Sequence, residues 1–139
     1  MHIDEIKNGL VLDHIKAGKA MEIYRFLDLG SLNCPVAIIQ NASSRKMGKK
    51  DIIKIDGVLD IDCNILAPIC PDITLNVIKD GVRVEKRALE LPLEIKDIIR
   101  CKNPRCITTT EQELPHIFRL RKTKESIYRC LYCEARAEL

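Results

Sequence analysis

The chain has 139 residues, an apolar content of 46% and a net charge of +3, from 23 basic and 20 acidic side chains. This length suits one ordinary domain or two small ones, and the mildly basic balance falls short of that of a polyanion-coating protein. The acidic first residues are unlike a signal peptide, and no stretch approaches the roughly 20 apolar residues of a membrane span. With seven cysteines in such a chain, we expect a reducing cytoplasm.

The N-terminal part of the chain reads as alternating strands and helices. A helix is predicted over 18–29, because Ala20, Ile23, Tyr24 and Leu27 fall on one helical face. A weaker helix is predicted over 60–66, before Pro68. Strands are predicted at 10–15, 35–40, 51–56, 73–78 and 82–86, with a polar, basic loop at 41–50 and an Asp-Gly hairpin turn at 79–81. The order β-α-β-β-α-β with one extra strand is typical of a ferredoxin-like α/β sandwich, an antiparallel sheet with two helices on one face.

The C-terminal part reads as a small all-β unit. Residues 88–100 form a partly packed connector, and two strands are predicted at 117–122 and 126–131, around a turn at 123–125. A unit of roughly 45 residues rarely buries enough apolar surface to fold alone. The sequence therefore predicts that a bound metal supplies part of its stability.

Four cysteines in this part arrive in two close pairs. Cys101 and Cys106 have four residues between them, Cys130 and Cys133 have two, and 23 residues separate the pairs. Such spacing lets two tight turns present four thiolates to one tetrahedral metal. Two disulfides, thiols that merely pack, an iron site and a redox CxxC motif are the alternatives. Cys34, Cys63 and Cys70 lack such spacing and are expected to pack as small apolar residues.

No Ser-His-Asp pattern, Walker loop or GxGxxG motif is present, and no paired carboxylates stand out. Four cysteine ligands fill the coordination shell of zinc and leave no position for a substrate. The sequence therefore predicts a structural metal site and no enzyme. One interpretation is a zinc ribbon that binds nucleic acid through a basic run, although aromatic stacking residues are scarce. That run consists of Arg119, Arg121, Lys122 and Lys124.

The second interpretation is a sensor of a small phosphorylated ligand. Lys54 lies inside an otherwise apolar strand, and Lys86 is in phase with Val82 and Val84. Lysine is almost never buried without a partner, so two lysines aimed at one place would suit a phosphate group. The alternative is that each lysine extends along a strand edge into solvent.

Longer segments resemble one known family, the regulatory chain of aspartate carbamoyltransferase. The similar segments are 9–15 (GLVLDHI), 47–55 (MGKKDIIKI), 67–78 (APICPDITLNVI) and the four cysteines with their spacing. They occur in the family's order and cover nearly the whole chain. The resemblance implies a nucleotide-binding domain over 1–93 and a zinc domain over 94–139 that contacts the catalytic chain. It also implies a non-catalytic, cytoplasmic subunit of pyrimidine biosynthesis.

The resemblance also implies roles for particular residues. Asp13, Lys54 and Lys86 take the main polar roles at a site for the allosteric effectors CTP, ATP or UTP, and His14 matches as well. Ile6, Asn76 and Ile78 match positions around the base and sugar. Cys101, Cys106, Cys130 and Cys133 hold one structural zinc ion per chain.

Partners follow from the same resemblance. The N-terminal domains are expected to pair into a homodimer, helped by the exposed edge of a sheet. The zinc domain is expected to dock on the catalytic chain through Asn103, Arg105 and Glu134, which lie in or just after the cysteine loops. Neither a nucleic acid nor a membrane is an expected partner under this interpretation.

Overall fold

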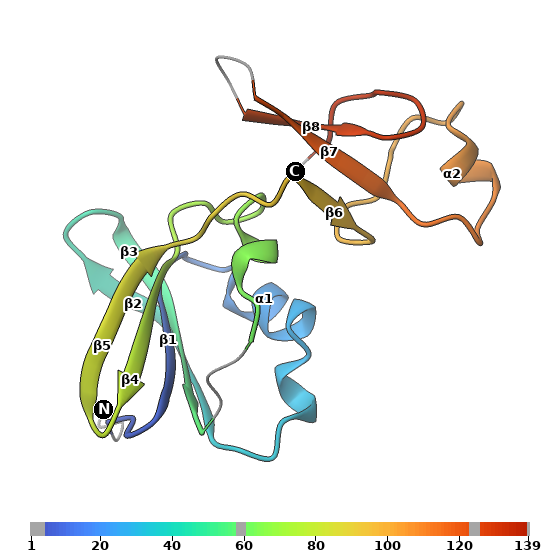
Figure 1. Ribbon diagram of the computed structural model, residues 1–139. Coiled ribbons are helices and arrows are strands. Elements are labelled where there is room, and N and C mark those ends of the chain that lie inside the picture. Colours follow the sequence, from blue (N-terminus) through green and yellow to red (C-terminus); the bar gives the residue numbers. More distant parts are fainter. Residues whose placement is uncertain (1–4, 58–60, 123–125, 139) are drawn as a thin grey trace. The chain divides into compact units, whose positions relative to one another are not determined.

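The computed structural model describes residues 5–57, 61–122 and 126–138. The chain divides into two compact units, Met1–Glu90 and Leu91–Leu139. Among the described residues, no helix is long and apolar enough to cross a membrane. Each unit is built around its own sheet (Figure 1).

The N-terminal unit is a five-stranded antiparallel sheet with short helical segments. Its spatial order is β2-β3-β1-β4-β5, and every neighbouring pair is antiparallel. The strands are β1 (Gly9–Lys16), β2 (Val36–Ser44), β3 (Gly48–Asp56), β4 (Thr74–Lys79) and β5 (Val82–Ala88). The helical segments are α1 (Ala20–Phe26), η1 (Leu29–Ser31) and η2 (Asn64–Leu66).

This strand order is that of a split βαβ unit. The segment containing α1 joins β1 to β2, and β3 inserts between these two strands and pairs with both. β5 adds the extra strand beyond β4. The predicted ferredoxin-like class is therefore confirmed, with β2 and β5 as the two edges of the sheet.

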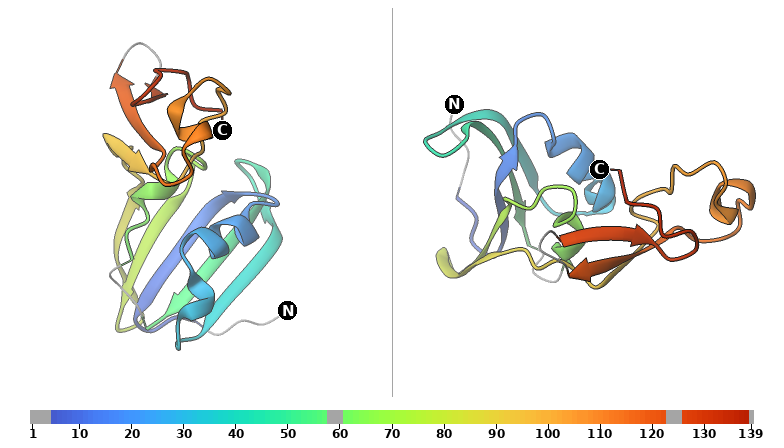
Figure 2. Two further views of the ribbon diagram at one scale, coloured as in Figure 1. Left: turned by 90° about the vertical axis from the view of Figure 1, so that its right-hand side faces the viewer. Right: turned by 90° about the horizontal axis from the view of Figure 1, so that it is seen from above.

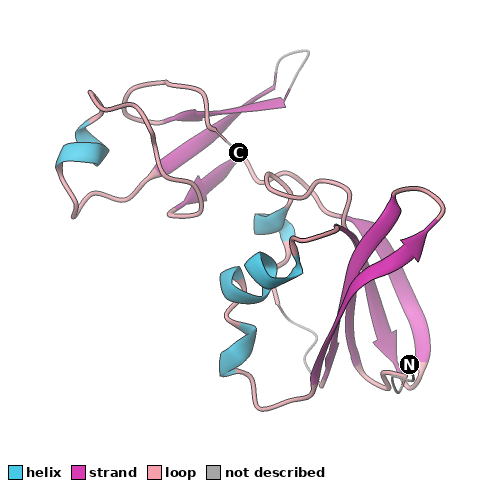
Figure 3. Ribbon diagram, turned by 180° about the vertical axis from the view of Figure 1, so that it is seen from behind, coloured by secondary structure: helices cyan, strands magenta, loops and turns pink. Residues whose placement is uncertain are grey.

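The two faces of the sheet have different surroundings. Because side chains alternate along a strand, Leu10 and Leu12 of β1, Ile53 of β3 and Leu75 of β4 point to one face, where they are buried. Ala20 and Ile23 of α1 join this core, and the helical segments gather on that face (Figures 2 and 3). The opposite side, called the outer face below, carries no described helix of this unit.

Several element boundaries differ from the predictions. The loop predicted over 41–50 is wrong: β2 and β3 continue into a hairpin closed by residues 45–47, where Gly48 adopts φ +79°. The helix predicted over 18–29 is shorter, since Asp28 turns to φ 51° between α1 and η1. The described part of the second predicted helix is only the 3₁₀ turn η2.

Asp51 fastens the start of α1 to the sheet. Its side chain on β3 is fully buried, and its carboxylate accepts three backbone hydrogen bonds. The donors are the N–H groups of Gly18 (3.0 Å), Ala20 (3.2 Å) and Asn41 (3.0 Å). Buried carboxylates require such partners, so this residue ties α1 and the irregular segment of β2 to one point of β3.

The C-terminal unit is a three-stranded antiparallel sheet with one short helix. Its order is β6-β7-β8, formed by β6 (Glu94–Lys96), β7 (Ile117–Lys122) and β8 (Ser126–Cys130), and α2 covers Ile107–Thr110. The two strands predicted here are confirmed almost to the residue. The connector prediction missed β6, and the turn predicted at 123–125 lies outside the described residues. The Tyr128 hydroxyl donates to the Pro92 carbonyl at 2.6 Å, which fastens the start of this unit to its core.

The three cysteines of the N-terminal unit behave as predicted. Cys63 and Cys70 are buried in the core, and Cys34 is half-buried against it. Burial raises the pKa of Cys63 to about 11 and also raises the pKa of Cys70. Both thiols therefore stay protonated near neutral pH and act as apolar packing groups.

Candidate metal centre and effector-binding face

The four paired cysteines form one cluster. Their sulfur atoms all lie within 4.8 Å of one another, with Cys101 and Cys133 3.6 Å apart and Cys106 and Cys130 3.7 Å apart. A disulfide requires about 2.05 Å between sulfurs, and all four cysteines are free. Four sulfurs that each lie about 2.3 Å from a tetrahedral metal are about 3.8 Å apart. The donor set therefore fits one tetrahedral metal ion, and the disulfide alternative is wrong.

Local backbone geometry positions the first cysteine pair. The Cys106 N–H donates to the Asn103 carbonyl at 3.0 Å, and the Arg105 N–H donates to the Asn103 side chain at 3.1 Å. Cys106 precedes α2, and its thiol lies 3.0 Å from the buried Thr108 hydroxyl. The Cys101 N–H donates to Nδ1 of His116 at 3.0 Å, which fixes the start of the loop.

The second cysteine pair sits at the end of β8. The Glu134 N–H donates to the Cys130 carbonyl and the Cys130 N–H donates to the Ala135 carbonyl, both at 2.9 Å. Glu134 adopts φ 64°, a left-handed conformation that turns the chain sharply after Cys133. Both thiols of this pair thus face the first pair across a tight turn.

The thiols differ in acidity. Burial raises the pKa of Cys101 to about 12 and also raises that of Cys130. At Cys133 the effect of burial is outweighed by hydrogen bonds from the Asn103 side chain and the Ala135 backbone, which lower the pKa to about 7. A coordinated divalent cation deprotonates thiols outright, so its charge is what brings all four to the thiolate form.

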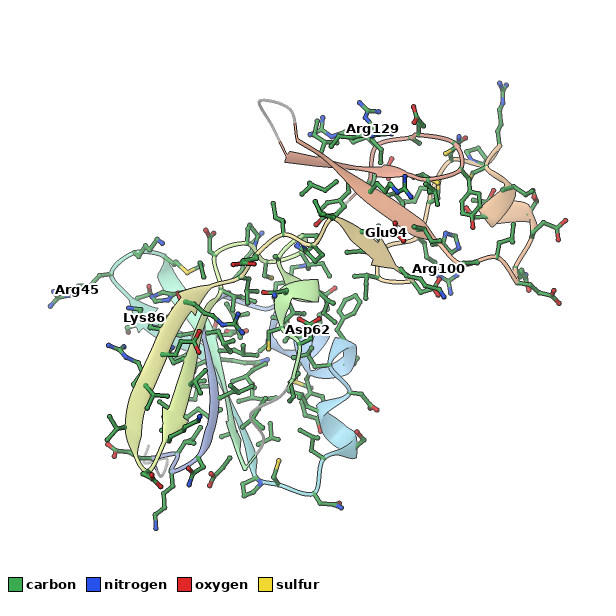
Figure 4. The ribbon with its side chains drawn as sticks, viewed as in Figure 1. Arg45, Asp62, Lys86, Glu94, Arg100 and Arg129 are labelled. Atoms are coloured by element: carbon green, nitrogen blue, oxygen red, sulfur yellow. The ribbon has the colours of Figure 1, made fainter. Side chains whose placement is uncertain are left out.

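A row of side chains crosses the outer face of the N-terminal unit. Lys54 on β3 lies opposite Val11 on β1, Val11 lies opposite Asn76 on β4, and Asn76 lies opposite Lys86 on β5. Directly opposed residues of antiparallel strands point to the same face, so the two predicted lysines share one side of the sheet. Three strand spacings of about 4.8 Å separate their backbones, and Lys86 is labelled on β5 in Figure 4.

Asn76 contributes an unpartnered acceptor to this row. It is 8% exposed, and its amide nitrogen lies 3.5 Å from the Val11 carbonyl. Its Oδ1 atom is the one buried side-chain polar atom among the described residues that has no hydrogen-bond partner. A buried acceptor without a hydrogen-bond partner reduces the stability of the fold. A hydroxyl or amino group of a ligand on the outer face would supply the missing donor.

Asp13 and His14 form a bulge in β1 beside the row. The register with β3 shifts between Leu12 and Ile15, and His14 adopts φ 58°. The Asp13 carboxylate accepts the His14 N–H at 2.7 Å, and the His14 ring lies 3.1 Å from the Thr74 hydroxyl. The sequence predicts neither the bulge nor the side-chain directions that follow from it.

Lys50 is a neighbour that sequence reasoning missed. Its ammonium group lies 2.9 Å from the Asp13 carboxylate, and both side chains are largely buried. Burial opposes ionisation of Asp13, but the hydrogen bond and charge of Lys50 and the His14 N–H outweigh it, so the pKa of Asp13 lies below its ordinary value. The alternation of β3 places Lys50 in phase with Lys54, which is a signal the sequence does contain.

Ile6, one of the two remaining predicted effector residues, borders two cavities. Ile6 is buried and borders a cavity of about 290 Å³ together with Ala37, Lys54 and Asp56. It also borders a cavity of about 360 Å³ beside Asp80 and Gly81. Ile78 is half-buried, two residues beyond Asn76 on β4 and in phase with it. The structure thus places apolar surface at one end of the row.

The predicted partner residues lie around the cysteine cluster. Asn103 is half-buried in the first cysteine loop, and Arg105 of the same loop is exposed. The Glu134 carboxylate is 3.1 Å from Arg121, so it already holds an intramolecular partner. Arg119 is likewise paired with Glu94 at 3.3 Å. Two cations of the predicted nucleic-acid run are therefore neutralised, and Lys124 lies outside the described residues.

The two units correspond to an allosteric domain and a metal-binding domain. Residues 1–90 match the family model described as the allosteric domain of the aspartate carbamoyltransferase regulatory chain, and residues 93–138 match that of its metal binding domain. The chain therefore belongs to the family of aspartate carbamoyltransferase regulatory chains. The free zinc-ribbon alternative is not favoured, because both parts match this family.

Curated relatives are similar to this chain over nearly its full length. The chain is 47% identical to the aspartate carbamoyltransferase regulatory chain of Clostridium acetobutylicum, over 95% of this chain and 90% of the relative. It is 48% identical to that of Clostridium tetani, over 95% and 92%. It is 37% identical to that of Bifidobacterium longum, over all of both chains.

Proposed function

We propose that this chain is a non-catalytic subunit that binds nucleotide effectors on the outer face of its N-terminal domain and docks on a catalytic chain. The proposed effector domain covers 1–93 and the proposed docking domain covers 94–139. The effectors are CTP, ATP or UTP, in line with the regulatory and allosteric descriptions of the relatives and the family. The observation that carries the proposal is the row from Lys54 through Asn76 to Lys86 on one open face.

The chemistry of this face suits a nucleoside triphosphate. Lys54 and Lys86 supply cations, Asn76 supplies an unpartnered acceptor for a ribose hydroxyl or a base amino group, and Ile6 and Ile78 supply apolar contact. Lys50 and His14 hold Asp13 and Thr74 in place beside the row. The lysines and Asp13 provide binding and orientation, and no group is assigned a covalent step.

The metal of the docking domain is proposed to be a single zinc ion held by Cys101, Cys106, Cys130 and Cys133. Its four thiolate ligands leave no open coordination position, so it supplies a structural cross-link between the two cysteine loops. Asn103, Arg105 and Glu134 then lie on loops whose shape the metal fixes, which supports their proposed contact with the catalytic chain.

Two copies are proposed to pair through their N-terminal domains. β5 is an edge strand, all of its residues are exposed, and Val82 and Val84 are 62% and 55% exposed. An exposed edge with apolar side chains favours pairing with another strand. The cation Lys86 on the same strand would then lie near the pair's boundary.

Isothermal titration calorimetry of the full chain with CTP and with ATP tests the effector site. A hydrogen bond to a charged group contributes roughly 1.5–3 kcal/mol, so Lys54→Ala and Lys86→Ala should each weaken binding by about ten- to a hundredfold. Lys79→Ala is the matched control, because Lys79 is exposed on β4 but out of phase with Asn76. Unchanged affinity in the Lys54→Ala/Lys86→Ala double variant would contradict the assignment.

A further inference from the structure

The outer face carries a second pair of lysines that the row does not use. Lys16 at the end of β1 lies directly opposite Lys50 near the start of β3. Directly opposed residues have Cβ atoms about 4.5–5.5 Å apart, and like charges in such positions are destabilising. Asp13 neutralises Lys50 at 2.9 Å, whereas exposed Lys16 has no carboxylate partner within the described part of the chain. The pair therefore retains an uncompensated positive charge.

These lysines lie on the same face as the row. On β3, the core residues Asp51, Ile53 and Ile55 alternate with Lys50, Ile52 and Lys54, so Lys50 and Lys54 point to the outer face. On β1, Ile15 is fully buried in the core, so Lys16 points outward. The His14 ring lies against Thr74 between the row and Lys16.

The two ends of the outer face differ in chemistry. One end has the cavity bordered by Ile6, Ala37 and Lys54, whose lining also includes the carboxylates of Glu5 and Asp56. The other end has Lys16 and Lys50, followed by the hairpin with Arg45, Lys46 and Lys49; Arg45 is labelled at that hairpin in Figure 4. Lys16 lies five positions beyond Val11 of the row, or about 15 Å at the rise of a strand. The long, flexible side chain of Lys16 can bring its ammonium group closer to the row than this backbone distance.

We propose that Lys16 binds the terminal phosphates of the effector and thereby selects nucleoside triphosphates over monophosphates. The inference rests on the effector site proposed above and adds the orientation of the ligand. The base lies toward Ile6, the sugar and first phosphate lie near the row, and the β- and γ-phosphates reach the Lys16–Lys50 pair. Bound phosphate relieves the repulsion between the two ammonium groups, because it places negative charge between them.

Calorimetry of the full chain with CTP and CMP tests this orientation. Because Lys16 is exposed, we expect Lys16→Ala to weaken CTP binding by about five- to tenfold. CMP binding should change by less than about twofold, since its single phosphate stays near the row. Lys16→Arg retains the charge and should keep most of the preference for CTP.

Lys19→Ala is the matched control. Lys19 precedes α1 and is paired with Glu22 at 3.0 Å, so its removal changes net charge equally without touching the outer face. Equal loss of CTP and CMP affinity in Lys16→Ala, or no loss of either, would overturn the proposal while leaving the effector site intact. If the unmodified chain binds neither nucleotide, the effector site itself is wrong and this inference fails with it.

Discussion

Replacing the buried carboxylate of Asp51 with an amide tests how the N-terminal domain is held together. In Asp51→Asn the remaining oxygen can keep the two bonds from Gly18 and Ala20, but these become neutral and roughly half as strong. That change costs about 1 kcal/mol for each bond. The new amide group then faces the Asn41 N–H, and a buried donor without an acceptor costs about 1–3 kcal/mol.

The total loss is about 3–5 kcal/mol, against a typical domain stability of about 5–15 kcal/mol. Urea denaturation followed by circular dichroism measures the change in free energy of unfolding. Amide hydrogen exchange at Gly18, Ala20 and Asn41 reports whether the loss arises where expected. The matched control is Asp62→Asn. Asp62, which is labelled in Figure 4, accepts a single exposed hydrogen bond from the Asn64 N–H at 3.0 Å.

The control should change stability by less than about 1 kcal/mol. The proposed role of Asp51 is refuted if the free energies of unfolding of Asp51→Asn and Asp62→Asn differ by less than about 0.5 kcal/mol. It is also refuted if the three amides keep their protection from hydrogen exchange.

Two further predictions concern charge and metal. Because the pKa of Asp13 is lowered in the folded chain, its ionised form stabilises the fold above the ordinary value of 3.8, and this contribution is lost as the pH falls through the folded-state pKa. Asp13→Asn should therefore reduce stability more at pH 6 than well below pH 3.8; an equal loss in urea denaturation at both would contradict the Asp13–Lys50 pair. Removal of the metal by a chelator, or Cys130→Ser, should unfold the C-terminal domain and leave the N-terminal domain folded. Metal analysis and hydrogen exchange measure this, and stoichiometric zinc retained in Cys130→Ser would count against a four-cysteine site.

The proposed effector face was predicted mainly from residue types that alternate with a period of two along the strands. Lys54 interrupts an apolar strand and Lys86 follows Val82 and Val84 at period two, so both strands were predictable. The alternation along β5 was not, because its pairing with β4 shifts register between Val82 and Lys86.

The shared face of the two lysines depends on the register of β3-β1-β4-β5. The tight turn between β4 and β5 favours one register, but the register shifts between Val77 and Ile78. Asn76 therefore lies opposite Lys86 rather than Glu85, which the sequence does not predict. The assignment of nucleotide contacts to these residues stays a prediction.

The features that sequence reasoning missed depend on irregular backbone. The bulge at Asp13 and His14 breaks the alternation of β1, and it brings Asp13 to Lys50. The basic residues around Gly48 were interpreted as a loop, because polar composition outweighed the turn signal of a single glycine. The spacing of the cysteines, in contrast, was sufficient to predict the cluster, since two short loops leave few other arrangements.

We propose that nucleotide binding in the N-terminal domain is coupled to the catalytic partner docked on the C-terminal domain. Coupling between binding free energies is reciprocal. The most direct measurement is the affinity for CTP of the complex reconstituted with catalytic trimers, with and without a bisubstrate analogue. We predict that the analogue changes the dissociation constant of CTP by the same factor by which CTP changes that of the analogue. A chain that assembles with the trimers, but whose CTP affinity is the same in both states, would contradict the claim.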